Sequence, residues 1–479
     1  MTLLNKKLKS ILLSIIAVIA VILACFAFVG CAEIDIPSGG GNTDITTPGN
    51  TDDNNTGDDN NTGDDDPDPE PEPEPEPEPV YTEGLAYEKI KNGEFVVGYS
   101  VVGIGEAKDT KIVIPAEYEE KPVTTIAAKA FEDCYKLTEI ILPDTITAIE
   151  SNAFDGCERI EWTEYGNCRY LGTSDNPHFA LIREAAPDIT SCGVHKDTAI
   201  IASNAFRSWR RDFDRVDYSG TIEDWCKIAF CSFSSNPLVY ANNLYINGEL
   251  VTELVIPTNM TEIPDYIFAG ISATKVVFPS GLKEIGKSAF YGSGITAVRI
   301  SGGLERINSN AFASCRALKT VNIKGADGLI IDKNAFLSTD ELQTVSIESN
   351  SCVLSGSMFN YAKSLNTVTL KGDGIKIGSF CFQYCDALKT VSLVGDGMDI
   401  GSFSFDECEA FAILNLDGIP TQIGAYAFSK GLKRIKFTGN KVAWSLIKKD
   451  KNWMGYYSYI NPSAITVECT DGNVIEYGN

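Results

Sequence analysis

The most regular feature of the chain is a phenylalanine, usually preceded by alanine, that returns about every 23 residues. The last eight of these marker phenylalanines, from Phe268 to Phe428, are spaced 22, 22, 24, 23, 23, 23 and 23 residues apart. A fixed period of this length is the signature of a solenoid, in which each repeat forms one coil. The eleven markers are Phe131, Phe154, Phe206, Phe268, Phe290, Phe312, Phe336, Phe359, Phe382, Phe405 and Phe428.

Between two markers, the apolar positions predict a strand and a return turn. Residues 318–323 alternate so that Val321 and Ile323 point inward from a short strand. A proline, or an Asp-Gly pair such as Asp373 and Gly374, then turns the chain. The alanine–phenylalanine pair predicts a short helical or 3₁₀ turn that brings the chain back. Because one coil cannot bury its own apolar face, we expect a β-rich α/β solenoid of stacked coils, each with one short parallel strand.

The repeat also carries a more specific pattern, Pro-x₅-Ile-x₃-Ala-Phe-x₂-Cys, as at Pro143, Ile149, Phe154 and Cys157. This pattern resembles the BspA-type leucine-rich repeat family of bacterial surface proteins, and the resemblance covers nearly everything from Ile112 onward. It implies a leucine-rich repeat solenoid. It also implies a function in adhesion, to host matrix proteins or to neighbouring cells.

Two stretches interrupt the period, with 52 and 62 residues between successive markers. We interpret them as coils with inserted β-hairpins, with two separate domains as the alternative. A Gly-x₄-Trp-x₂-Ile element occurs at residues 220–228 and again at residues 439–447. We expect it to close one half of the solenoid and to cap the other. The predicted parts are an N-terminal cap with the first coil (81–130), repeats with two inserts (131–250), the regular array (251–436) and a C-terminal cap (437–479).

The first 80 residues predict export and anchoring. Lys6, Lys7 and Lys9 precede an apolar run over residues 11–29, and a small residue, Gly30, stands directly before Cys31. The segment resembles a bacterial lipobox, so residues 1–31 are predicted to be a lipoprotein signal peptide with Cys31 as the lipid attachment site. An ordinary signal peptide or an uncleaved anchor helix are the alternatives. The expected location is the extracellular face of the envelope.

Residues 32–80 hold sixteen acidic residues and no lysine or arginine, with alternating proline and acid near the end. Low hydrophobicity and like-charge repulsion leave such a segment without a core, and it is predicted to be a disordered, extended tether, or simply a flexible linker. The chain's net charge of −25 therefore leaves −12 for residues 81–479, with 37 basic and 49 acidic residues. This excess of acid argues against nucleic acid or an anionic membrane surface as a partner, so membrane contact is expected through the lipid anchor only.

The cysteines and histidines are the residues most able to form a site of chemistry. A ladder of cysteines three residues after the marker is typical of a core position, and it comprises Cys134, Cys157, Cys315, Cys385 and Cys408. Disulfides between Cys226 and Cys231 or between Cys381 and Cys385 remain open. Cys192 and His195 place a thiol near an imidazole, as a nucleophile would require, but a structural turn is the favoured interpretation.

No motif for a metal or a cofactor occurs, and the Asp-Gly pairs are interpreted as turns rather than calcium sites. We expect no catalytic residues. An unrecognised hydrolase in the inserts, over residues 162–247, is the enzymatic alternative.

The remaining candidate for function is the polar side of the strands on the concave side of the solenoid. There, four threonines at equivalent positions are expected to form a row across four coils, although threonine also suits an exposed strand for structural reasons. The candidate ligand face consists of Lys319, Thr320, Asn322, Gln343, Thr344, Ser346, Asn366, Thr367, Thr369, Lys389, Thr390 and Ser392, with the basic residues Lys433, Arg434 and Lys436 in the last coil. We expect a non-enzymatic protein that binds a protein or glycan ligand outside the cell. A glycan-binding accessory protein of a polymer-degrading system is the second alternative.

Overall fold

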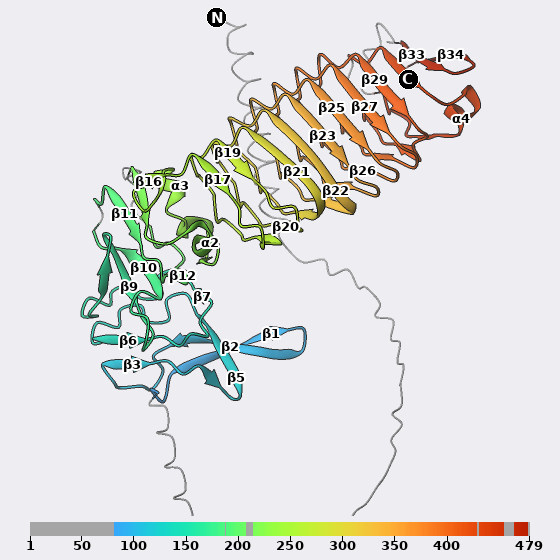
Figure 1. Cartoon of the computed structure of the whole chain (residues 1–479). Helices are drawn as coiled ribbons and strands as arrows, with labels where there is room; N and C mark the ends of the chain where they lie inside the picture. The colour runs from blue at the N-terminus through green and yellow to red at the C-terminus, as the bar shows by residue number, and fades with distance from the viewer. Residues whose placement is uncertain (1–80, 187, 207–213, 429–430, 455–463, 478–479) are drawn as a thin grey trace, which may run out of the picture. The chain divides into compact units, whose positions relative to one another are not determined.

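The computed structural model describes residues 81–186, 188–206, 214–428, 431–454 and 464–477 (Figure 1). The predicted signal peptide, Cys31 and the acidic tether lie outside the described residues. The described residues all belong to one compact unit. Within its described residues, the unit is built almost entirely from short strands, as the 23-residue period predicted.

The N-terminal end of this unit is a small sheet. Its antiparallel hairpin is followed by a parallel strand, and a separate parallel pair begins the solenoid. The strands are β1 (Ala86–Asn92), β2 (Phe95–Gly103), β3 (Lys111–Val113), β4 (Glu117–Tyr118), β5 (Lys121–Ile126), β6 (Glu139–Ile141) and β7 (Ala148–Ile149).

The two stretches that interrupt the period contain antiparallel hairpin strands, β8–β9–β10 in the first and β15–β16 in the second, as predicted. Three short helices also fall in the second stretch. The strands are β8 (Thr163–Tyr165), β9 (Cys168–Leu171), β10 (Ala180–Glu184), β11 (Ser191–Val194), β12 (Ile200–Ile201), β13 (Arg215–Tyr218), β14 (Ala229–Phe230), β15 (Leu244–Ile246) and β16 (Glu249–Leu250), and the helices are α2 (Ile222–Trp225), η1 (Phe233–Ser235) and α3 (Leu238–Ala241).

The regular array is a solenoid with parallel strands in register from coil to coil, which confirms the predicted fold (Figure 1). Its main strands are β17 (Glu253–Val255), β19 (Lys275–Val277), β21 (Ala297–Ile307), β22 (Thr320–Ile331), β23 (Thr344–Glu348), β25 (Thr367–Lys371), β27 (Thr390–Val394), β29 (Ile413–Asp417) and β31 (Arg434–Phe437). After β31 come α4 (Lys441–Leu446) and the hairpin of β33 (Ala464–Cys469) and β34 (Gly472–Tyr477). In this hairpin, β33 pairs parallel with β31.

Each coil differs from the prediction in two details. A second ladder of two-residue strands runs beside the main one: β18 (Glu262–Ile263), β20 (Glu284–Ile285), β24 (Val353–Leu354), β26 (Lys376–Ile377), β28 (Asp399–Ile400), β30 (Gln422–Ile423) and β32 (Lys448–Lys449). On the marker side, non-helical turns replace the expected helical turn. The reason is that residues two before and two after the marker adopt positive φ angles, as Asn334 (62°) and Ser338 (57°) do around Phe336. This conformation is incompatible with a right-handed helix.

The marker phenylalanines form the core of the solenoid. From Phe268 to Phe428 each ring stacks on the next, with centroids 5.0–5.8 Å apart, and all of these side chains are buried. The turn that carries each marker is also bonded to the next coil, since the Phe359 amide donates to the Cys381 carbonyl at 2.8 Å.

The cysteine ladder packs beside the phenylalanines, as predicted. The thiols of Cys157, Cys315, Cys385 and Cys408 are buried, and each donates to the carbonyl of the marker in the preceding coil at 3.0–3.4 Å. Cys134, in the first coil, is half-buried. Cys226, Cys231, Cys381 and Cys385 are free thiols, so neither disulfide left open by the sequence is formed.

Candidate ligand-binding face

The row of threonines on the strand face is present. Parallel pairing sets Thr320 opposite Thr344, Thr344 opposite Thr367, and Thr367 opposite Thr390. The valines that follow them are buried, so the threonines lie on the outer side of the sheet. Thr344 is exposed and the other three are half-buried, with the hydroxyl oxygen of Thr320 covered. The row ends in apolar residues, because Ala297 pairs with Thr320 and Ile413 pairs with Thr390.

A second polar row lies two residues further along each strand. Pairing aligns the predicted residues Asn322, Ser346, Thr369 and Ser392. It also adds Arg299 before the row and Asn415 after it. The Asn415 amide donates to the Ser392 hydroxyl at 3.1 Å. These two residues were not predicted, although the shared repeat offset was a signal for both.

At the start of the same strands, the surface has a hollow of about 550 Å³. The predicted residues Gln343, Thr344, Asn366 and Thr367 line it, together with Lys363, Ser364 and Ala387. Lys363 and Ser364 were not predicted because they precede the strand. Outside a strand, the alternation of polar and apolar residues does not indicate which way a side chain points. The hollow gives this otherwise flat face one place where a ligand group could be partly enclosed.

Charges at the far ends of the strands are paired with one another. The Glu348 carboxylate lies 3.1 Å from the Lys371 ammonium and 3.6 Å from that of Lys324. The hydrogen bond from Lys371, followed by the charge of Lys324, lowers the pKa of Glu348 below its ordinary value. Lys319 and Lys389, at the strand starts, are exposed. The face is therefore mainly hydrogen-bonding in character, with charge at its margins.

One of the three basic residues of the last coil forms an ion pair. Lys433, Arg434 and Lys436 are all exposed, but the Arg434 Nε lies 3.3 Å from an oxygen of Glu468 on β33. The hairpin beyond the array thus neutralises part of the positive patch that the sequence predicted.

The Asp-Gly turns use their carboxylates within the fold. An oxygen of Asp373 accepts the Asp396 amide at 2.8 Å, and an oxygen of Asp396 accepts the Ile419 amide at 2.8 Å. Each aspartate therefore links its turn to the next coil, as the turn interpretation requires. Among the residues that the structure describes, no group of three or more histidine, cysteine or acidic side chains is arranged to hold a metal ion.

The Cys192–His195 region does not form a nucleophilic pair. Cys192 is fully buried, and its sulfur lies 3.3 Å from that of Cys168. Burial raises the pKa of Cys192 well above its ordinary value, which keeps the unreactive thiol form. The His195 ring instead stacks on His178, with centroids 4.0 Å apart, and its Nδ1 accepts the Asp197 amide. These are the only two histidines in the sequence.

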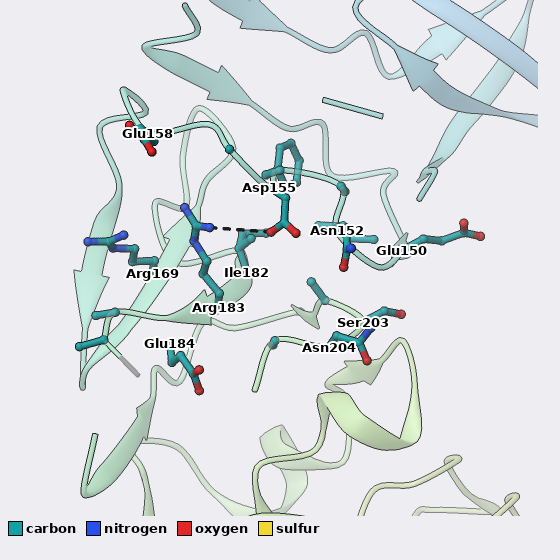
Figure 2. A pocket seen from close by; sticks show the side chains of 18 residues that line it. Glu150, Asn152, Asp155, Glu158, Arg169, Ile182, Arg183, Glu184, Ser203 and Asn204 are labelled. Atoms are coloured by element: carbon teal, nitrogen blue, oxygen red, sulfur yellow. Dashed lines mark ion pairs between the residues drawn. The ribbon is translucent and has the colours of Figure 1, made fainter. Parts of the chain in front are cut away.

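A pocket of about 420 Å³ lies between the early coils and β10 of the first insert (Figure 2). The Arg183 and Asp155 side chains point toward one another in it, with Nη1 and Oδ1 4.0 Å apart. The Arg183 guanidinium also lies 4.9 Å from the centre of the Trp162 ring. Polar groups of Asn152 and Asn204 complete the lining. Arg183 lies in the inserts that the sequence offered for the enzymatic alternative, but no motif in the sequence singled out Arg183 or Asp155.

Comparison with known proteins agrees with this architecture. The chain matches the family model described as BspA type leucine-rich repeat region, in six copies, over residues 110–180, 240–366 and 353–445. No curated protein has a sequence that matches the chain. No helix within the described residues is both long enough and apolar enough to cross a membrane.

Three of the solved structures that match the chain are leucine-rich repeat proteins. A leucine-rich repeat protein from Bacteroides ovatus is 20% identical, with 80% of this chain and 100% of that chain covered and a TM-score of 0.41. A leucine-rich cell surface protein from Faecalibacterium prausnitzii is 21% identical, with 77% and 97% covered and a TM-score of 0.30. A leucine-rich repeat protein from Eubacterium ventriosum is 12% identical, with 76% and 87% covered and a TM-score of 0.30.

Proposed function

This chain belongs to the BspA-type leucine-rich repeat family, and from that premise we propose that it is a bacterial surface protein that binds a protein or glycan outside the cell. It acts by adhesion rather than catalysis, and its ligand lies along the strand face. The main support is the row from Thr320 to Thr390, which repeats one hydrogen-bonding group in register over four coils.

The chemistry of this face favours a ligand rich in hydrogen-bonding groups. Hydroxyl and amide side chains dominate both rows, and these groups can both donate and accept hydrogen bonds. Because each coil contributes a similar small contact, binding energy is spread along the face. Single substitutions such as Thr344→Ala are therefore expected to change affinity little.

The lipid anchor is part of the same proposal. A thioether-linked diacylglycerol on Cys31 would hold the chain at the outer side of the envelope, with the acidic tether as a spacer. Metabolic labelling with a palmitate analogue should mark the wild type and leave Cys31→Ala unlabelled and released from the envelope. Equal labelling of both would contradict the anchor.

The binding face is tested by changing all four threonines at once. Thr320, Thr344, Thr367 and Thr390 replaced together by lysine place four like charges one strand spacing apart, about 4.8 Å. This variant should lose binding on an array of glycans and matrix proteins while its melting profile stays nearly unchanged. The matched control replaces the same four residues by serine, which keeps the hydroxyls and should keep binding.

The rival location is the insert pocket around Arg183 and Asp155. A variant that lacks the inserts but keeps the coils tests it directly. Normal binding by the four-lysine variant, together with loss of binding in the insert deletion, would move the site from the strand face to the insert. Binding of polysaccharide but of no protein would favour the accessory role in a polymer-degrading system.

A further inference from the structure

We propose that Cys168 and Cys192 are a disulfide-forming pair that covalently joins the first inserted hairpin to the neighbouring strand β11. In the structure both are free thiols, fully buried, with their sulfur atoms 3.3 Å apart. They lie 24 residues apart in sequence and belong to two different sheets. A bond between them would therefore add a covalent cross-link between the two sheets.

The backbone around the two thiols is held in a fixed position. The Gly193 amide donates to the Gly166 carbonyl at 2.7 Å. A Cβ atom added to Gly166 would lie 2.2 Å from the Cα of Gly193, so only two glycines permit this approach. The Asn167 side chain donates to the Ser191 carbonyl at 3.0 Å. These contacts involve the residues immediately before Cys168 and on both sides of Cys192, and they fix the register that brings the sulfurs together.

The pair also differs from the cysteine ladder in how its thiols are used. The ladder thiols of Cys157, Cys315, Cys385 and Cys408 each donate to a carbonyl of the preceding coil. The Cys168 and Cys192 thiols contact each other across two sheets instead. Cys385 and Cys408 also interact with each other, but as members of the ladder at the repeat offset. Cys168 and Cys192 lie outside that offset, so the repeat does not account for their contact.

The reaction requires an oxidant, which a disulfide such as oxidised glutathione supplies. The two thiols lose their protons and two electrons, and a sulfur–sulfur bond forms between them. The glutathione disulfide accepts both electrons and both protons, and its bond breaks to give two molecules of glutathione. Because both sulfurs are buried in the folded chain, we expect the bond to form while the hairpin packs onto β11.

The bond would stabilise the part of the insert that lines the pocket. Cys168 begins β9, the next residue Arg169 lines the pocket, and β9 pairs with β10, which carries Arg183. A cross-link that closes a loop of this length restricts the unfolded chain and raises the melting temperature. The oxidised protein should thus melt several degrees above the reduced protein.

The test uses the full chain, unfolded in reducing denaturant and refolded with reduced and oxidised glutathione. After the remaining thiols are alkylated, trypsin should yield residues 160–169 joined to residues 184–196, each with one cysteine. Oxidised wild type should take up two fewer alkyl groups than the reduced protein. Cys168→Ser should abolish the joined peptide and this difference, whereas the matched control Cys469→Ser should retain both.

The peptide map of the wild type decides the proposal even if Cys168→Ser fails to fold. Recovery of native circular dichroism without the joined peptide would overturn it. So would a bond that joins either cysteine to a third one, or an equal melting temperature for the oxidised and reduced proteins.

Discussion

Each marker phenylalanine of the regular array has an equivalent ring in the adjacent coil. Phe359 is fully buried and stacks on Phe336 at 5.0 Å and on Phe382 at 5.1 Å. Stacked aromatic pairs add stability beyond the area they bury. A single ring therefore contributes to two coil interfaces, and its loss cannot be repaired by one neighbour.

Phe359→Ala should lower the free energy of unfolding by about 3–5 kcal/mol, as expected when a large buried ring is removed from a packed core. Asn366→Ala, directly before strand β25 on the strand face, should change the free energy of unfolding by no more than about 0.5 kcal/mol. Denaturant melts of the two variants provide the measurement. Similar losses for both would mean that the inside and outside of the coil are wrongly assigned.

The stacked histidines predict a dependence of stability on pH. Burial lowers the pKa of His178 and of His195 below the ordinary value of 6.5, and the charge of His195 adds to the effect on His178. As the pH falls, the unfolded chain therefore binds protons before the folded chain does. Stability is complete above the unfolded pKa and decreases from about pH 7 down to the lowered folded pKa values.

Thermal melts between pH 7.5 and 5.5 should show this decrease in the wild type. Replacing both histidines by glutamine should make the melting temperature less sensitive to pH over the same range. This interval lies above the ordinary pKa of the carboxylates, so their titration contributes little. An unchanged slope in the double variant would assign the pH dependence to other groups.

At the scale of elements, the two Gly-x₄-Trp-x₂-Ile segments adopt the same local structure. Trp225 on α2 packs edge-to-face against Tyr218 on β13 at 5.1 Å, and Trp444 on α4 packs against Phe437 on β31 at 5.5 Å. Both tryptophans are buried. The sequence revealed the pair by repetition, but the reason for the glycine became visible only in the structure. A Cβ on Gly439 would lie 2.3 Å from the Phe437 ring.

Gly439→Ala should therefore displace the Phe437 ring and destabilise the C-terminal end by about 1–3 kcal/mol, as overpacking of a core does. Gly281→Ala is the matched control, because a Cβ there meets no atom within 4 Å. It should leave stability within about 0.5 kcal/mol of the wild type. Equal denaturation midpoints for the two variants would show that the ring moves aside without cost.

The elements that the sequence did not predict share a physical cause. Strands such as β24 and β26 are two residues long, too short for alternation to be recognised. The turns beside the markers place positive φ angles on bulky residues such as Phe380 (60°) and Phe403 (58°), where local preference predicts none. Both features depend on hydrogen bonds and stacking supplied by the neighbouring coil, as between the Phe380 and Phe403 rings at 5.1 Å. The insert pocket and the Cys168–Cys192 contact likewise arise from residues far apart in sequence.

At the scale of the whole molecule, the long-range regularity was the most predictable property. The marker spacing fixed both the coil length and the register, so Thr320, Thr344, Thr367 and Thr390 could be aligned before any contact was known. In the structure, each coil of the regular array bonds to the coil before it and the coil after it. Stability is then approximately a sum of coil and nearest-neighbour terms.

This additivity predicts that one whole coil can be removed from the array. Deleting residues 367–389 brings Thr390 opposite Thr344 in place of Thr367 and Ile400 opposite Leu354 in place of Ile377. It also sets Phe405 beside Phe359, so every ladder stays in register. The shortened chain should keep a cooperative thermal transition, with a melting temperature only a few degrees lower. Deleting residues 367–378 instead removes half a coil, so that turn residues 379–383 would stand opposite β23 in place of β25 and the buried ladders would lose their register. Circular dichroism melts should show a broadened or lost transition for this second variant, and equal behaviour of the two deletions would contradict the nearest-neighbour description.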